Sequence, residues 1–282
     1  APNGQAIVTW LHEEAGRNVW VRRFNNGSWG APELVAEGAY GRPAAAIASN
    51  GDAYVMFDRY NSANNTSTFF GRASLAGAAF GPEETVTEAR SRFFVTDLAI
   101  SGNQRVALFV YDDTPLGQLG QNAHLFATRF NGGTWSPLTR FDDEGEQVYA
   151  GRVVMNDTGA ARGYWITRAG IQHRFAATGG DFGARETLPF PATGYHMTGA
   201  MNVAGDALAV WSGNDVMQAA RATPGGSFGT PVTIFARDGY IGSVFAPSLA
   251  PSGAGAALWM NGDWSDDEVN WQTYNLWGSV LH

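Results

Sequence analysis

A repeat with a period of about 50 residues constrains this chain more than any other feature. A glycine or asparagine is followed six residues later by a large aromatic residue in six places: Gly4 to Trp10, Gly51 to Phe57, Asn103 to Phe109, Gly159 to Trp165, Gly205 to Trp211 and Gly253 to Trp259. Successive copies are 46 to 56 residues apart. A repeat of this length indicates an array of similar supersecondary units.

Each copy predicts a meander of short strands. The segments from glycine to aromatic, such as GDAYVMF at 51–57, are too short and too apolar for an amphipathic helix, which favours buried strands. A further apolar run precedes each glycine after the first, and the Gly or Asn between the two runs supplies the positive φ of a tight hairpin. A third run carries an arginine in five copies, with a threonine in the last: Arg23, Arg72, Arg129, Arg174, Arg221 and Thr273.

A turn then places an aromatic residue before a small one and leads into a fourth strand. These pairs are Trp29-Gly30, Phe80-Gly81, Trp135-Ser136, Phe182-Gly183, Phe228-Gly229 and Trp277-Gly278. Four-stranded repeats of this length are typical of β-propellers. We therefore predict an all-β, six-bladed β-propeller of four-stranded antiparallel blades, forming a single domain over residues 1–282. The predicted blades are approximately 1–42, 43–90, 91–148, 149–194, 195–242 and 243–282.

The ends of the chain do not match a whole number of blades. Only four residues precede the second strand of the first unit, so the first blade is expected to lack its innermost strand, and the chain is expected to finish on the fourth strand of the sixth. Either the N-terminus has been trimmed, or the first and last blades close by side-chain packing without a shared sheet.

Composition excludes several classes of function. The formal net charge of −8 repels phosphate backbones, which argues against nucleic acid as a partner. The absence of cysteine excludes disulfides and thiolate metal sites, and no apolar run is long enough to span a membrane. All 18 basic residues are arginine. This acidic, lysine-free, glycine- and aromatic-rich composition favours an extracytoplasmic bacterial protein, which is secreted, periplasmic or on the cell surface.

Variable loops place the candidate binding site on one face. The turns between strands 1 and 2 and between strands 3 and 4 are short and alike, whereas those between strands 2 and 3 and between blades differ in length and chemistry. Function concentrates where loops diverge over a repeated scaffold. The blade connections bring arginine, tyrosine and histidine to the predicted channel mouth, and these types suit anionic groups and sugar rings. The candidate ligand-binding residues are Tyr40, Arg42, Arg92, Tyr149, Arg152, Tyr195, His196, Arg237 and Tyr240. The alternative is that they cap strand ends and pair with nearby carboxylates.

An acidic loop near the C-terminus is a candidate calcium site. In NGDWSDDE, oxygen-bearing side chains alternate, as a calcium loop requires: Asp263, Ser265 and Asp267, followed by Glu268. The alternative is solvated surface charge. No other cofactor is expected. No catalytic residue is assigned, because no Ser/His/Asp spacing, nucleophile elbow, HExxH or phosphate loop is present.

The repeats resemble those of a known group of proteins. GDALAVW, an arginine-bearing strand and GGSFGTP are similar to the repeats of bacterial extracytoplasmic β-propeller proteins, distantly similar to sialidase-type (BNR-repeat) propellers, over all six units. The turns NNGSWG, NGGTWS and PGGSFG keep the glycine and aromatic residue of the sialidase turn motif without its aspartate. The resemblance implies three arginines around a substrate carboxylate. Arg42, Arg92 and Arg152 stand at the starts of successive inner strands, at unequal offsets from their glycines.

Three functions follow as hypotheses. The leading one is a non-enzymatic, lectin-like propeller that recognises a glycan or a protein partner through its variable-loop face. The alternative is a glycosidase- or lyase-like enzyme that acts on an anionic sugar at the channel mouth. The third is a structural subunit of a surface assembly. An enzyme of the paired-carboxylate type requires two carboxyls within about 5–10 Å of each other.

Overall fold

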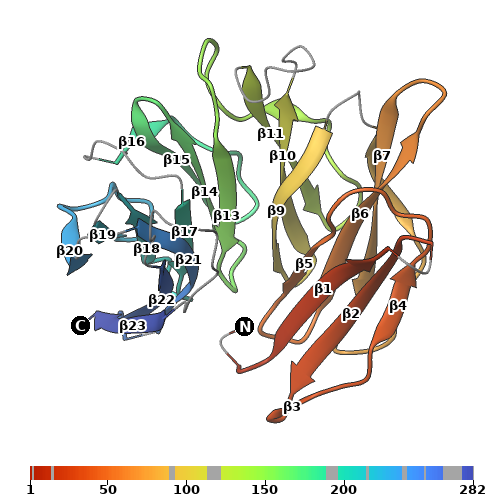
Figure 1. Ribbon diagram of the computed structural model, residues 1–282, viewed down its shortest axis with the longest axis horizontal. Helices are drawn as coiled ribbons and strands as arrows, with labels where there is room; N and C mark the ends of the chain where they lie inside the picture. The colour runs from red at the N-terminus through yellow and green to blue at the C-terminus, as the bar shows by residue number, and fades with distance from the viewer. Residues whose placement is uncertain are drawn as a thin grey trace, which may run out of the picture. The chain divides into compact units, whose positions relative to one another are not determined.

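The structure is a computed structural model that describes residues 1, 3–13, 16–88, 93–112, 122–188, 196–213, 216–236, 240–250, 252–262 and 275–281. Within these ranges all regular structure is β-strand (Figure 1). The chain divides into two compact units, residues 1–153 and 154–282. In the described part of the chain, no helix is long and apolar enough to cross a membrane.

Among the described residues the strands form six antiparallel sheets, numbered here in chain order. The first three sheets belong to the first unit. Their strands are β1 (Ala6–His12), β2 (Asn18–Asn25), β3 (Ser28–Trp29) and β4 (Glu33–Ala36) in sheet 1, β5 (Ala44–Ile47), β6 (Ala53–Asn61), β7 (Thr66–Ser74) and β8 (Glu84–Glu88) in sheet 2, and β9 (Phe93–Ser101), β10 (Gln104–Asp112), β11 (Ala123–Asn131) and β12 (Thr139–Arg140) in sheet 3.

The remaining sheets follow the same order of strands. Sheet 4 begins with β13 (Ala150–Met155), which contains the point where the two units divide. The other strands are β14 (Ala161–Thr167), β15 (Gly170–Ala176) and β16 (Glu186–Thr187) in sheet 4, β17 (His196–Met201), β18 (Ala207–Ser212), β19 (Val216–Ala222) and β20 (Val232–Ala236) in sheet 5, and β21 (Tyr240–Leu249), β22 (Gly255–Gly262) and β23 (Asn275–Leu281) in sheet 6.

The predicted all-β architecture of four-stranded antiparallel meanders is confirmed for sheets 2 to 5. In sheet 1, β3 and β4 both pair with β2 and share the outer position, and no described strand precedes β1.

The last sheet departs from the expectation. β23 pairs with β22 along its whole length, with Trp277 opposite Trp259, so it is the third strand of sheet 6. The prediction that the chain finishes on a fourth strand, with Trp277-Gly278 in the preceding turn, was therefore wrong. A tryptophan before a glycine resembles the turn motif, but here it lies within a strand. Thr273, the expected counterpart of the strand-3 arginines, lies outside the described residues.

Repeat glycines form the hairpins as expected, with one exception. Gly4, Gly51, Gly159, Gly205 and Gly253 all have φ between 79° and 93°. In the third copy the positive φ falls on Gly102, at 52°, and not on the predicted Asn103. A glycine adopts this conformation without steric cost, so it takes the position when it is adjacent.

Within each unit, sheets bury their faces against their neighbours. One cluster joins sheets 1 and 2 through Val19, Val21, Val55 and Phe57, and another joins sheets 2 and 3 through residues that include Met56, Phe69, Leu98 and Phe109. In the second unit, Leu208, Val210 and Met217 of sheet 5 pack with Ala257 of sheet 6. Of the repeat aromatics, Phe57, Phe109, Trp165 and Trp211 are buried, in line with the core role that the sequence predicts.

The turn motif of an aromatic followed by a small residue has a backbone explanation. In the first five sheets the small residue donates its N–H at 2.8 Å to a carbonyl of the preceding long strand, which is β2 in sheet 1 and the third strand in sheets 2 to 5: Gly30 to Arg23, Gly81 to Ala73, Ser136 to Arg129, Gly183 to Phe175 and Gly229 to Arg221. This backbone bond closes the hairpin between the two strands.

In each unit an arginine of the described chain ties one sheet to the turn of the next. Arg23 of sheet 1 donates from Nη1 to the carbonyl of Ala78 at 2.9 Å, and its guanidinium lies 4.6 Å from the ring centroid of Phe80. Arg162 of sheet 4 donates from Nη2 to the carbonyl of Gly226 at 3.0 Å, with its guanidinium 4.9 Å from the ring of Phe228. In both cases the acceptor carbonyl stands two residues before the turn aromatic. We call this arrangement the arginine clamp.

The clamp in the second unit includes a buried histidine. Arg162 Nη1 lies 3.2 Å from Nδ1 of His173, and both side chains are buried. His173 Nε2 lies 3.9 Å from the carboxylate of Glu186. Burial, reinforced by the positive charge of Arg162, lowers the pKa of His173 to about 4. Burial likewise lowers the pKa of Arg162. His173 is therefore neutral at pH 7 and accepts the bond from Arg162.

We predict that Gly199→Ala destabilises the fold by about 1–3 kcal/mol, because an added methyl would overpack a full interior. A Cβ at Gly199 would stand 2.8 Å from Cε2 of Tyr164, which is wholly buried, and 3.3 Å from the carbonyl of Leu208. Gly133→Ala is the matched control, since a Cβ there meets nothing within 4 Å. Denaturant unfolding measures both variants, and equal midpoints would contradict the packing described.

We also predict a pH-dependent contribution from His173. Because its pKa is lower in the folded protein than the usual value of 6.5, the unfolded chain binds more protons between pH 6.5 and about 4. The free energy of unfolding therefore loses about 2–3 kcal/mol from this group as pH falls through that window. His173→Gln should remove this pH-dependent contribution, so the unfolding free energy of the variant should fall less steeply between pH 6.5 and about 4. Parallel curves for the two proteins would disprove the assignment.

Candidate functional site

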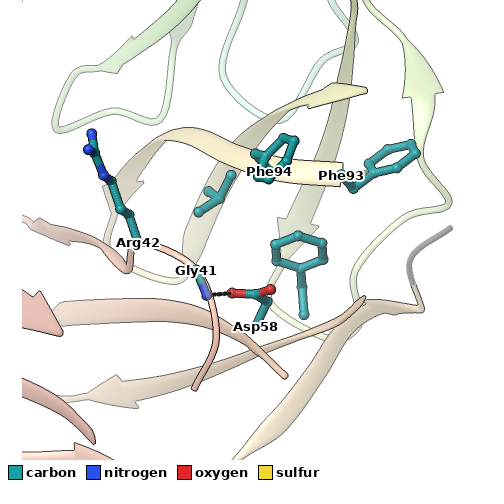
Figure 2. Close-up of a pocket in the computed structure, with 7 residues that line it drawn as sticks. Gly41, Arg42, Asp58, Phe93 and Phe94 are labelled. Carbon is teal, nitrogen blue, oxygen red and sulfur yellow. Dashed lines mark hydrogen bonds between the residues drawn. The ribbon is translucent and has the colours of Figure 1, made fainter. Parts of the chain in front are cut away.

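A cavity of about 270 Å³ lies between the second and third sheets of the first unit. The described residues that line it are Gly41, Arg42, Asp58, Phe69, Phe93, Phe94 and Val95 (Figure 2). We call it the Asp58 pocket.

Three segments of the chain build the pocket. Gly41 and Arg42 lie in the connection from sheet 1 to sheet 2. Asp58 of β6 is paired with Phe69 of β7. Phe93, Phe94 and Val95 are the first three residues of β9. These segments adjoin the loop between strands 2 and 3 and the blade connections, which vary most in sequence. The pocket therefore lies on the variable-loop side of its sheets.

Asp58 supplies the negative charge of the pocket. Its side chain is buried, with 5% exposure, and its Oδ1 accepts the N–H of Gly41 at 2.6 Å. The backbone carbonyl of Asp58 accepts the N–H of Tyr40 at 2.9 Å. Glycine is required at position 41, because a Cβ there would stand 2.7 Å from the same carboxylate oxygen. The connection and the strand are thus joined by two bonds that fix the carboxylate.

Arg42 supplies a positive charge at the rim. Its residue is exposed, and Figure 2 shows its side chain extending away from Asp58. No ion pair or hydrogen bond joins its guanidinium to another described residue. A free guanidinium presents a planar fork of donors that suits carboxylate, sulfate or phosphate.

Phenyl rings form much of the remaining wall. Phe69 meets Phe109 edge to face at 4.8 Å, and Phe93 stacks on Tyr111 at 5.0 Å, so both rings are held by the core behind them. Phe94 is 56% exposed and faces solvent. The pocket thus combines an apolar wall with one buried anion and one rim cation.

An exposed aromatic pair adjoins the pocket in the chain. Tyr40 precedes Gly41 and stacks on Tyr60 at 4.6 Å, and both rings remain largely accessible. The guanidinium of Arg17 lies 4.7 Å from the Tyr40 ring and also donates to the Tyr40 carbonyl. Flat, accessible and rigidly held rings are suitable surfaces for sugar stacking.

Other predicted site residues have different surroundings. Tyr149 is exposed and bonds Gln147 at 3.4 Å. Arg152 donates to the carbonyls of Thr96, at 3.4 Å, and Gly151, at 3.1 Å. Neither lines the Asp58 pocket. In the second unit, His196 is half-buried on β17, opposite Ser212.

Arg152 stands beside a second carboxyl group. Asp97 accepts the N–H of Val153 at 2.9 Å and of Leu98 at 3.0 Å, which joins β9 to β13. Burial raises the pKa of Asp97, and the charge of Arg152 opposes that rise. These contacts give Arg152 and Asp97 a structural role between inner strands.

Several predicted residues cannot be placed. Tyr240 begins β21, but its side chain is not described. The predicted ligand residues Arg92, Tyr195 and Arg237 and the candidate calcium ligands Asp263, Ser265, Asp267 and Glu268 lie outside the described residues. Where the structure is described, no group of three or more His, Asp or Glu side chains could hold a metal ion. Of the three arginines that the resemblance implied, Arg42 lines the pocket, Arg152 does not, and Arg92 lies outside the described residues.

Sequence reasoning missed Asp58, although a signal for it exists. The residue after the repeat aromatic is Leu11, Val110, Ile166, Ser212 or Met260 in five copies, and an aspartate in the second. A charge at an otherwise uncharged repeat position marks a departure from the scaffold. Phe93 and Phe94 carry no comparable signal, because aromatic residues are frequent throughout the chain.

Comparison with known proteins gives likeness in structure and none in sequence. No protein-family model and no curated protein matches the chain.

An α-L-arabinofuranosidase from Fusarium graminearum, solved with an iminosugar inhibitor, has a TM-score of 0.54 at 10% identity, over 99% of this chain and 90% of that one. A polysaccharide lyase described as an ulvan lyase has a TM-score of 0.59 at 14% identity, over 92% and 74%. An intramolecular trans-sialidase from Ruminococcus gnavus has a TM-score of 0.57 at 10% identity, over 100% and 92%. At these identities the comparisons show the fold, which is of the β-propeller type found in sialidases and related carbohydrate-active enzymes.

Proposed function

We propose that this chain is a carbohydrate-active β-propeller that holds an acidic saccharide at the Asp58 pocket and cleaves it by hydrolysis or elimination. The observation that carries the proposal is the exposed guanidinium of Arg42, which pairs with no other described residue, at the rim of a ring-lined cavity. An arginine in this position suits the carboxylate or sulfate of an acidic sugar. The six sheets are proposed to form the blades of one ring, and the extracytoplasmic location stays a prediction.

Two further observations support a saccharide as the ligand. The exposed Tyr40–Tyr60 pair adjoins the pocket in the chain and offers a stacking surface. Several structural neighbours are named as carbohydrate-active enzymes, and one is a polysaccharide lyase bound to an oligosaccharide that contains glucuronic acid and sulfated rhamnose. These neighbours favour the enzymatic hypothesis over the lectin-like one.

Binding without cleavage is the second candidate, and the lining of the pocket favours it. Hydrolysis by paired carboxylates needs two carboxyl groups about 5–10 Å apart. The described lining contains one, that of Asp58. A lectin-like propeller needs no such pair.

One experiment separates these candidates. The purified chain is incubated with acidic polysaccharides, both uronate-containing and sulfated, and with neutral arabinan. New reducing ends report cleavage, and ultraviolet absorbance of an unsaturated uronate distinguishes elimination from hydrolysis. Calorimetry measures binding in parallel. Cleavage of an acidic polymer supports the enzyme, whereas binding without product supports the lectin-like alternative. If no acidic polymer is bound or cleaved, the proposal fails.

Arg42→Gln tests whether the pocket is the site. Loss of a charge-assisted bond is expected to weaken binding of the acidic polymer about 10- to 100-fold. Arg185→Gln, which removes an equally exposed arginine in the second unit, is the matched control and should leave binding unchanged. Equal affinities of the Arg42→Gln variant and the wild type would exclude the pocket as the binding site.

A further inference from the structure

Asp58 is a buried carboxylate without a counter-ion in the described part of the chain. Oδ1 has one partner, the N–H of Gly41, and no ion pair of the described residues includes Asp58. Arg42 extends away from it (Figure 2). A carboxylate that has lost most of its water is costly unless a compensating charge is present. Among the residues that the structure describes, no positive charge compensates Asp58, so its carboxylate is available to a cation that enters the pocket.

The surroundings of Asp58 select the kind of cation. A calcium or magnesium ion requires six or more oxygen ligands, supplied by the protein or by water. The described lining offers a single carboxylate and the rings of Phe69, Phe93 and Phe94. Phenyl faces attract organic cations through their quadrupoles, and they favour ammonium groups that can give up water. Rings beside a carboxylate are the arrangement that recognises an organic ammonium.

We infer that the Asp58 end of the pocket is a subsite for an organic ammonium group. Since Arg42 stands at the rim, the matching ligand is a zwitterion, with its cation against Asp58 and the phenyl rings and its anion against Arg42. As applied to a saccharide, the inference rests on the proposed function: the acidic sugar would also carry a free amino group. The ammonium subsite itself depends only on the pocket.

A neutral donor is the competing occupant. A hydroxyl group could donate to Asp58 without balancing its charge, and it would gain nothing from the phenyl faces. The two occupants are separated by a pair of probes that have the same shape and differ in charge, namely choline and its neutral carbon isostere 3,3-dimethylbutan-1-ol.

The experiment titrates both probes into the full chain, with calorimetry and ligand-observed NMR as readouts. Choline is expected to bind at least about 10-fold more tightly than the neutral alcohol. Asp58→Asn should abolish this preference, because the amide keeps an oxygen for the Gly41 N–H but lacks the charge. Asp181→Asn removes an exposed carboxylate in the second unit and should retain the preference. Thermal unfolding confirms that the variants are folded.

The outcomes distinguish the two proposals. Equal affinity for choline and its isostere, or an unchanged preference in Asp58→Asn, would overturn the ammonium subsite. The isostere comparison uses wild-type protein, so it decides the matter even if the variant does not fold. Binding or cleavage of acidic polymers without a preference for choline would leave the proposed function standing and refute this inference. A preference for choline without binding or cleavage of acidic polymers would support this inference and refute the proposed function.

Discussion

The bond between an arginine guanidinium and the turn of the following sheet, made by Arg23 and by Arg162, joins two successive sheets in each unit. The guanidinium makes two contacts at once. Its flat face lies against the ring of the turn aromatic, and its N–H groups donate to the backbone carbonyl two residues before that aromatic. A lysine ammonium cannot do both, because it is a compact charge without a planar face. All basic residues of the chain are arginine, and the structure describes this interaction at Arg23 and at Arg162.

The clamp also explains why the turn motif recurs. The small residue closes the hairpin by a backbone bond, and in two copies the preceding aromatic side chain, Phe80 or Phe228, lies under the guanidinium of the other sheet. The buried Arg162 shows how far the arrangement can be extended, because it keeps a neutral histidine as an additional acceptor. The repeat is thus defined by contacts between successive sheets as well as by the strands themselves.

Much of the fold could be predicted from the sequence because repeated units multiply each local signal. A glycine six residues before an aromatic is weak by itself, and six copies at a similar spacing establish strands, hairpins and sheet order. The prediction failed where one copy departed from the pattern. Trp277-Gly278 matches the turn motif but lies in β23, and Gly102 takes the φ expected of Asn103. The conformational freedom of the adjacent glycine explains the second exception, whereas only the pairing of β23 with β22 reveals the first.

The pocket was less predictable for a physical reason. Its residues come from three segments that adjoin only after sheets 2 and 3 have packed, and two of its phenyl rings are fixed by core contacts with Phe109 and Tyr111. Arg42 was identified because blade connections are variable, whereas Asp58 lies on a strand that periodicity assigns to the core. Arg152, another predicted ligand residue, donates to two backbone carbonyls, and its role in binding stays a prediction. Position in a repeat identifies candidates, and three-dimensional neighbours decide their roles.

The open turn at Gly133 gives this chain a practical property. Nothing lies within 4 Å of a Cβ added there, and the hairpin beside it closes through backbone atoms. Because none of the 282 residues is lysine, one introduced at this turn would carry the sole side-chain amine of the chain. Amine-reactive dyes, polymers or solid supports would then find one side-chain target, far along the chain from Asp58, besides the terminal α-amine.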